Sequence, residues 1–109
     1  MKKEIRFYRT PDGKEPFTYW FETLKDKTIR AQLKNRLERV AVGNYGDCKA
    51  LGDGIFELRI HYGPGYRVYF SEKGNYFILF LAGGTKSNQQ KDIKKAKAYW
   101  ADFQERTNE

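Results

Sequence analysis

The hydrophobic positions of this chain follow two periods, and each period predicts a different kind of element. Residues 4–8, 56–62 and 66–70 alternate apolar and polar side chains, which is typical of half-buried strands. Residues 76–82 are apolar almost throughout, as in a strand covered on both faces. Elsewhere, apolar residues recur every three or four positions and mark one face of each of three helices. The pattern therefore predicts the order β-α-α-β-β-β-α in one α+β domain.

The predicted helices also carry start and stop signals. Pro16 suits the first turn of the first helix, Asp26 can cap the second, and Gly43 can end it. Gly83-Gly84 is expected to break the last strand, and Ser87-Asn88-Gln89-Gln90 has the form of a capping box that starts the last helix. The apolar faces of the three helices consist of Phe17, Trp20, Phe21 and Leu24, of Ile29, Leu33, Leu37 and Val40, and of Ile93, Ala96, Trp100 and Phe103.

Short connections join the later strands. Residues 44–50 contain turn formers and are predicted to be a loop, while 63–65 and 71–75 are predicted turns. Because short turns join antiparallel neighbours, we expect a small antiparallel-rich sheet with one apolar and one polar face. Two N-terminal helices and one C-terminal helix complete this architecture.

The polar face of the predicted hairpin carries charged side chains where a plain sheet would carry Thr or Ser. Alternation places Glu57, Arg59 and His61 on one side of their strand. Antiparallel pairing across the short turn can bring Arg67 and Tyr69 to the same side. Glu57 is expected to orient or neutralise Arg59.

A further basic residue, Lys86, follows the glycine pair at the end of the adjacent strand. Guanidinium groups bind phosphate oxygens bidentately, so Arg59, Arg67 and Lys86 together suit phosphodiester chemistry on RNA. In that chemistry the 2'-hydroxyl of the substrate is the nucleophile, and the protein moves protons and neutralises charge. His61 is the first candidate for acid or base, because an imidazole titrates near neutral pH. Tyr69 is a second candidate and is also expected to contact the RNA, although a tyrosine on a strand also packs in a core.

Composition agrees with a polyanionic partner. The 109 residues have the length of one domain, 1–109, and carry 21 Lys and Arg against 14 Asp and Glu, a net charge of +7. Nucleic acid is the first candidate partner and an acidic protein segment the second. The single cysteine excludes an intrachain disulfide and a cysteine-based metal cluster, and no cofactor is implied. Without a long apolar run, we expect a cytoplasmic protein with no membrane partner.

One basic stripe lies outside the hairpin. Lys27, Arg30 and Lys34 recur at helical spacing on the second predicted helix. A solvated face is the simpler interpretation, and contact with RNA phosphates is the functional one.

Two segments resemble a known family. The sequences FELRIHYGPGYRVYF and FLAGGTKSNQQKDIKKAKAYW, together with the order of elements, resemble the RelE/ParE superfamily of toxins. The similarity is greatest to the HigB-like, phage-derived addiction-module killer proteins. It covers nearly the whole chain and is most specific from Leu51 to Trp100, where Gly-Gly-x-Lys-x-x-Gln-x-x-Asp-Ile follows the Tyr-Arg strand.

The resemblance implies a RelE-like fold and the toxin of a type II toxin-antitoxin system. It implies a metal-independent, ribosome-dependent mRNA endoribonuclease, an mRNA interferase that arrests translation. Its partners would be mRNA on the ribosome and a cognate helix-turn-helix (HigA-like) antitoxin. Arg59, Arg67 and Lys86 match the basic residues that bind and polarise the scissile phosphate.

The resemblance leaves the proton-transfer residue and the activity open. Ribosome-dependent members place a Tyr or His in their C-terminal segment, whereas Tyr99 and Trp100 here suit packing, so His61 is the local candidate. ParE-type members poison DNA gyrase without cleaving RNA, which is the alternative activity. A basic RNA-binding module without toxicity is the third interpretation.

Overall fold

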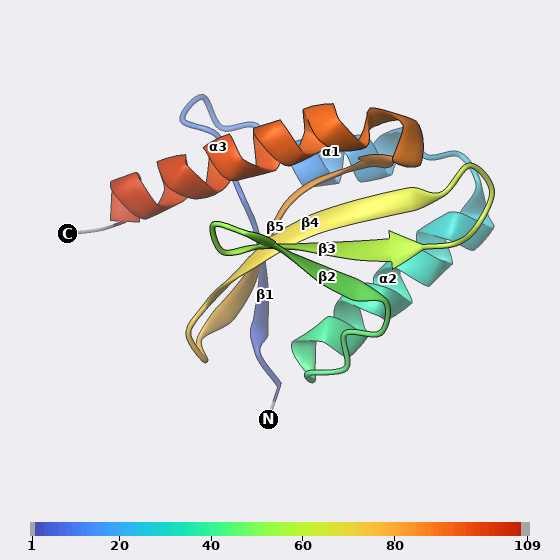
Figure 1. The fold of residues 1–109 in the computed structure, drawn as a ribbon, viewed down its shortest axis with the longest axis horizontal. Coiled ribbons are helices and arrows are strands. Elements are labelled where there is room, and N and C mark those ends of the chain that lie inside the picture. The colour runs from blue at the N-terminus through green and yellow to red at the C-terminus, as the bar shows by residue number, and fades with distance from the viewer. Residues whose placement is uncertain (1, 108–109) are drawn as a thin grey trace.

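The computed structural model describes residues 2–107 (Figure 1). It is an α+β structure with five strands and three α-helices. In chain order the elements are β1 Glu4–Phe7, α1 Pro16–Thr23, α2 Lys27–Ala41, β2 Cys48–Gly52, β3 Ile55–Ile60, β4 Tyr66–Lys73, β5 Phe77–Thr85, the 3-10 helix η1 Lys86–Asn88, and α3 Gln89–Thr107.

The five strands form one mixed sheet in the order β1-β5-β4-β3-β2. Only β1 pairs in parallel, with β5, whereas the other three pairings are antiparallel. The prediction of an antiparallel-rich sheet is therefore confirmed. A register shift between Tyr69 and Phe70 of β4 marks a bulge in the pairing with β5, next to the polar residues of the hairpin.

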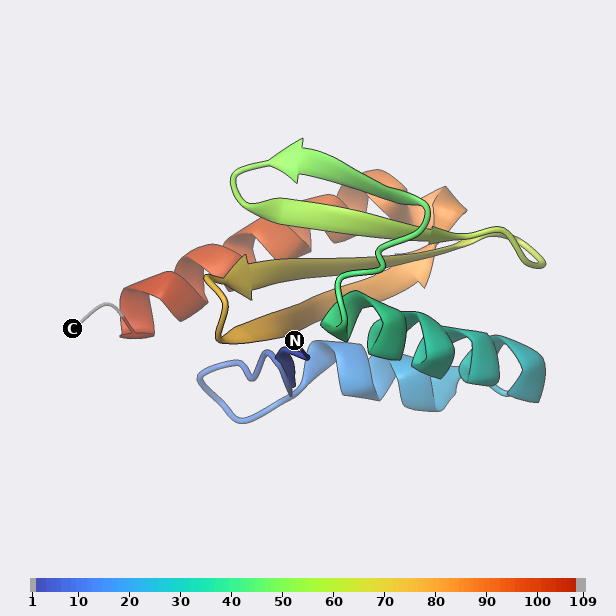
Figure 2. The same ribbon diagram turned by 90° about the horizontal axis from the view of Figure 1, so that it is seen from below.

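Helices cover both faces of the sheet (Figure 2). One core lies between the sheet and helices α1 and α2, and Val68 and Phe70 of β4 point into it. The other core lies under α3 and contains Tyr69, Ala96 and Trp100. Because side chains alternate along a strand, successive residues of β4 serve different cores.

The predicted helix signals explain the first two helices. Pro16 begins α1, and the Asp26 side chain accepts a hydrogen bond from the Thr28 N–H at 2.8 Å, which caps α2. The apolar stripe predicted for α2 is buried throughout: Ile29, Leu33, Leu37 and Val40. Within residues 2–107, no helix is long and apolar enough to cross a membrane.

The prediction of a loop over residues 44–50 is wrong at its end, because Cys48–Gly52 forms the additional strand β2. This strand pairs only with β3 and lies at the edge of the sheet. Its side chains are exposed or only partly buried, so it has no apolar face to pack. Hydrophobic periodicity therefore gives no signal for it.

The prediction that Gly83-Gly84 breaks the last strand is also wrong. Strand β5 runs on to Thr85, with Gly83 paired to Val68 and Gly84 to Arg67. A Cβ atom on Gly83 would overlap the Trp20 ring, and one on Gly84 would overlap the Asp92 carboxylate. These glycines therefore allow α1 and α3 to approach the two faces of β5.

The predicted capping box does not form. The 3-10 turn η1 precedes α3, and the Ser87 hydroxyl lies 3.0 Å from the Thr85 hydroxyl. Two strand ends also differ from prediction: β4 extends to Lys73 and β3 ends at Ile60.

Candidate functional site

The two arginines of the predicted site lie directly opposite each other in the sheet. Arg59 of β3 pairs in register with Arg67 of β4, and Glu57 pairs with Tyr69. The prediction that these side chains share a face is confirmed, and that face is the one covered by α3. Like charges directly opposite each other destabilise a sheet, so this arrangement requires a compensating anion.

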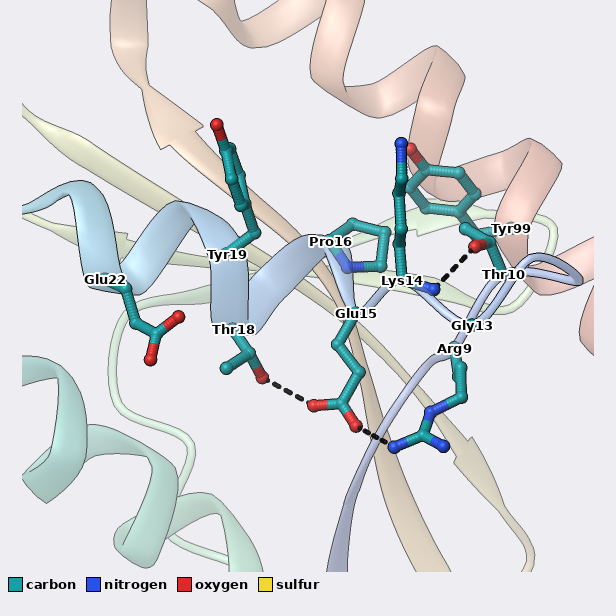
Figure 3. A pocket seen from close by; sticks show the side chains of 10 residues that line it. All are labelled: Arg9, Thr10, Gly13, Lys14, Glu15, Pro16, Thr18, Tyr19, Glu22 and Tyr99. Carbon is teal, nitrogen blue, oxygen red and sulfur yellow. Dashed lines mark hydrogen bonds and ion pairs between the residues drawn. The ribbon is translucent and has the colours of Figure 1, made fainter.

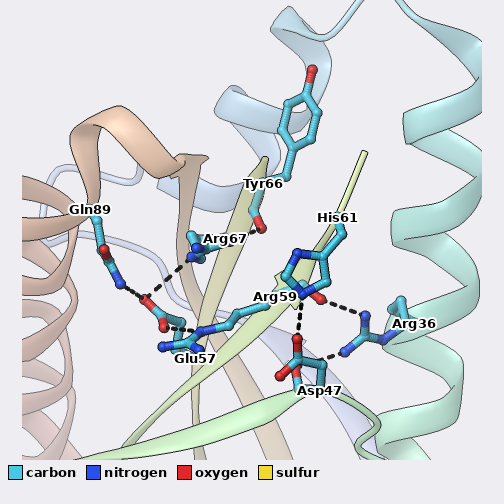
Figure 4. Close-up of polar contacts among 8 residues, drawn as sticks. All are labelled: Arg36, Asp47, Glu57, Arg59, His61, Tyr66, Arg67 and Gln89. Atoms are coloured by element: carbon cyan, nitrogen blue, oxygen red, sulfur yellow. Dashed lines mark hydrogen bonds and ion pairs between the residues drawn. The ribbon is translucent and has the colours of Figure 1, made fainter. Parts of the chain in front are cut away.

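Glu57 supplies that anion from a fully buried position (Figure 4). Its Oε1 accepts a hydrogen bond from Arg59 Nε at 3.0 Å, and its Oε2 accepts one from Gln89 Nε2 at 2.8 Å. Arg67 Nε lies 3.9 Å from the same Oε2. One carboxylate therefore holds side chains from β3, β4 and the start of α3.

Arg67 is a buried guanidinium with incomplete hydrogen bonding. Its side chain is only 7% exposed, against 31% for Arg59. Nη1 donates to the Tyr66 carbonyl at 3.4 Å, and Nε has no hydrogen-bond partner within residues 2–107. Two guanidinium groups face one carboxylate, so the cluster keeps a net positive charge that an anion can neutralise.

Lys86 lies beside Arg67 because a backbone contact fixes its position. The Lys86 N–H donates to the Gly65 carbonyl at 3.0 Å, which joins η1 to the turn before β4. Arg67, Lys86 and His61 line an open hollow of about 370 Å³ above this turn. We call it the turn hollow; its remaining lining residues are Tyr62, Gly63, Pro64 and Gly65.

His61 is placed differently from the prediction. It follows the last residue of β3 and turns toward the loop before β2, where its Nε2 lies 2.6 Å from Asp47 Oδ2. This hydrogen bond lowers the pKa of the Asp47 carboxyl. The imidazole is exposed and lines the turn hollow, so it stays beside Arg67 and Lys86 without belonging to the Glu57 network.

The prediction that Tyr69 contacts RNA is wrong. Its side chain is fully buried under α3, and burial, with the Glu57 charge, raises the pKa of its phenol. A buried phenol with a raised pKa packs in a core and cannot reach a ligand outside it.

None of the three residues of the basic stripe on α2 lines the turn hollow. The guanidinium of Arg30 lies 4.8 Å from the centre of the Phe21 ring, and Lys34 Nζ lies 5.9 Å from it. Arg30 also donates to the Leu24 carbonyl at 3.0 Å, whereas Lys27 is exposed at the start of the helix. These contacts connect α2 to α1, and they add no support for the predicted RNA contacts.

The contacts of three residues at the site were not fully predicted from the sequence. Glu57 was expected to serve Arg59 alone, and neither Gln89 nor Asp47 was expected to contact the site. The signal for Gln89 was its place in the Gly-Gly-x-Lys-x-x-Gln pattern, where a polar residue begins a helix that covers the sheet. Asp47 carries no such signal, because its contact with His61 depends on the path of a loop.

A larger hollow lies away from these residues, between α1 and the loop at residues 9–15 (Figure 3). Two of its charged side chains pair with each other, because Glu15 accepts a hydrogen bond from Arg9 at 2.9 Å; Glu15 also accepts one from Thr18 at 2.8 Å. None of the predicted site residues lines it. Within residues 2–107, no group of three or more side chains suits a metal ion either.

The fold and site thus define a small basic α+β protein with a cluster of cationic side chains at one end of its sheet. No protein-family model matches the chain. It is 47% identical over 81 residues to an uncharacterized protein of Haemophilus influenzae, an alignment that covers 74% of this chain and 82% of the relative. The chain therefore belongs to the same family as this Haemophilus protein.

Proposed function

We propose that this protein is a RelE-like toxin of a type II toxin-antitoxin system that cleaves mRNA on the ribosome. The observation that carries the proposal is that one buried carboxylate, Glu57, lies against the guanidinium groups of both Arg59 and Arg67, and that Arg67 and Lys86 line the same turn hollow. The order of elements and the two sequence segments that resemble HigB-like killer proteins support it. The antitoxin partner of helix-turn-helix type is part of the same proposal.

The proposed reaction uses the substrate's own nucleophile. The 2'-oxygen bonds to the adjacent phosphorus as the bond to the 5'-oxygen breaks, which leaves a 2',3'-cyclic phosphate and a 5'-hydroxyl. Negative charge builds on the phosphoryl oxygens in between. Arg59, Arg67 and Lys86 stabilise that charge, and one preorganised donor of this kind contributes about 10² to 10³ in rate.

Proton transfer is assigned to His61. When Nε2 carries the ring proton it donates to Asp47, and Nδ1 is then free to accept the proton of the 2'-hydroxyl. Asp47 acts as a positioning residue in this scheme, because it fixes the tautomer and orientation of the ring. The resulting imidazolium can protonate the departing 5'-oxygen.

An expression experiment in bacteria tests the proposal. Induction of the wild-type protein should stop growth and amino-acid incorporation, and primer extension should find new 5' ends within translated messages. Arg67→Ala should abolish both effects. Lys34→Ala removes an equal charge from a side chain that lies beside Phe21 and does not line the turn hollow, and it should remain as toxic as the wild type.

Two results would overturn the proposal. Accumulation of cleaved DNA complexes and an SOS response, with translation continuing, would assign the protein to the gyrase-poisoning class. Harmless expression of a folded wild-type protein would reduce it to an RNA-binding module.

A further inference from the structure

A second basic hollow adjoins the first on the side of α2. We call it the helix hollow; it measures about 240 Å³ and is lined by Gln32, Asn35, Arg36, Arg39, Asp47, Arg59, Ile60 and His61. His61 lines both hollows, so the two adjoin at this side chain. The four α2 residues recur at three- and four-residue spacing and therefore share one face of the helix.

Arg36 holds α2 against the site. Its Nη1 donates to the Arg59 carbonyl at 2.8 Å, and its Nη2 donates to the Tyr45 and Asp47 carbonyls, both at 3.1 Å (Figure 4). These bonds join the helix to β3 and to the loop before β2. The helix hollow therefore has a rigid wall, and its geometry relative to Arg59 is fixed.

Arg39 adds a third guanidinium group to the helix hollow, beside those of Arg36 and Arg59. Its side chain is exposed and makes no hydrogen bond or ion pair within residues 2–107. Burial lowers the pKa of Arg36, and repulsion from Arg39 contributes, while the Asp47 charge opposes both effects. Asp47 is also engaged by His61, so the helix hollow has an excess of positive charge that an anion would relieve.

We infer that the helix hollow binds the backbone phosphate of the nucleotide next to the cleaved bond, with Arg39 as its main ligand. The inference rests on the proposed function, because the turn hollow must hold the scissile phosphate. Arg59 lines the helix hollow and not the turn hollow, so it reaches the scissile phosphate from the side of the second phosphate. Successive phosphates of a single strand then lie on either side of His61, which places the imidazole at the sugar between them. The side-chain amides of Gln32 and Asn35 lie beside this second phosphate, where they can donate to sugar or base atoms.

Binding of non-cleavable RNA tests the inference. The probes are a hexanucleotide and a dinucleotide with one phosphate, both carrying 2'-O-methyl groups, and affinity is measured over a range of salt concentrations. Arg39→Ala should weaken hexanucleotide binding by about threefold to tenfold at low salt, and should lower the salt slope by about 0.7, the value of one phosphate contact in a single strand. Its affinity for the dinucleotide should not change.

The matched control is Lys34→Ala. Helix geometry places Lys34 on the opposite side of α2 from Arg39, where it faces Phe21. This variant removes the same charge from the same helix and should bind the hexanucleotide as the wild type does.

The outcomes separate the two proposals. If Arg67→Ala weakens binding but Arg39→Ala behaves like Lys34→Ala, the second phosphate site is wrong and the proposed function stands. If the wild type does not bind the hexanucleotide, or Arg67→Ala binds it equally well, the phosphate site of the proposed function is wrong and the inference falls with it.

Discussion

Replacement of Glu57 by Gln tests the network that holds the site. The side chain is fully buried and accepts hydrogen bonds from Arg59 at 3.0 Å and from Gln89 at 2.8 Å. Glutamine keeps the shape but removes the negative charge that lies 3.9 Å from Arg67 Nε, and the Arg67 side chain is only 7% exposed. The buried guanidinium is then left without a compensating anion.

The expected loss of stability follows from that burial. Breaking a buried ion pair costs about 3 to 5 kcal/mol, and the lower end applies here because Arg59 is partly exposed and can be hydrated. For a domain of about 100 residues, a loss of about 3 kcal/mol lowers Tm by roughly 10 to 20 °C. Urea denaturation gives the free energy of unfolding, and thermal denaturation gives Tm.

Two further variants make the test specific. Glu4→Gln removes a carboxylate from the exposed Arg6–Glu4 pair and should leave the unfolding midpoint unchanged. The double variant Glu57→Gln/Arg67→Met removes both buried charges and should be less destabilised than the sum of the single variants. A loss below about 1 kcal/mol in Glu57→Gln, or strict additivity in the double variant, would show that Glu57 does not compensate the charge of Arg67.

Three other variants probe the supports of the sheet. Gly83→Ala should destabilise the protein by about 1 to 3 kcal/mol, because the new methyl group overlaps the Trp20 ring, and urea denaturation measures the loss. Burial raises the pKa of Asp92, so the ionised carboxylate destabilises the folded protein as pH rises. Asp92→Asn should therefore be more stable than the wild type at pH 7 and equally stable at pH 3, and urea denaturation of both proteins at the two pH values measures the difference. Burial and the hydrogen bond to Asp102 raise the pKa of Tyr8 to about 12. The neutral phenol therefore stabilises the folded protein fully below about pH 10, and this stabilisation disappears as pH rises toward 12. Tyr8→Phe should lose less stability than the wild type over this pH range, as denaturation at several alkaline pH values measures.

Side-chain periodicity predicted the part of the fold that depends on burial. The stripe from Ile29 to Val40 and the alternation around Val68 mark faces that pack in the core, so their elements were predictable. Strand β2 was not, because an edge strand is held by backbone hydrogen bonds to one neighbour and needs no apolar face. The continuation of β5 through Gly83 and Gly84 was not predictable either. These glycines are in the strand because they leave space for the side chains of Trp20 and Asp92, and that packing cannot be read from the sequence.

For the site, too, only the face of the sheet that each residue occupies was predictable. Alternation predicts which face a residue occupies, and it correctly brought Arg59 and Arg67 together. It does not predict depth, so neither the burial of Tyr69 nor the central position of Glu57 followed from it. The direction of His61 depends on the residue at which β3 ends, and an alternating pattern continues past that point in the sequence.

The central claim is that Arg59, Arg67 and Lys86 form a catalytic phosphate site. Its most direct test is the single-turnover rate at which purified protein cleaves a message on programmed ribosomes, measured for the wild type and for Arg67→Ala. The wild type is expected to cleave the message and leave 5'-hydroxyl ends, and the variant is expected to cleave it at a rate about 10² to 10³ lower. An intact message with the wild type, or equal rates for the two proteins, would contradict the central claim.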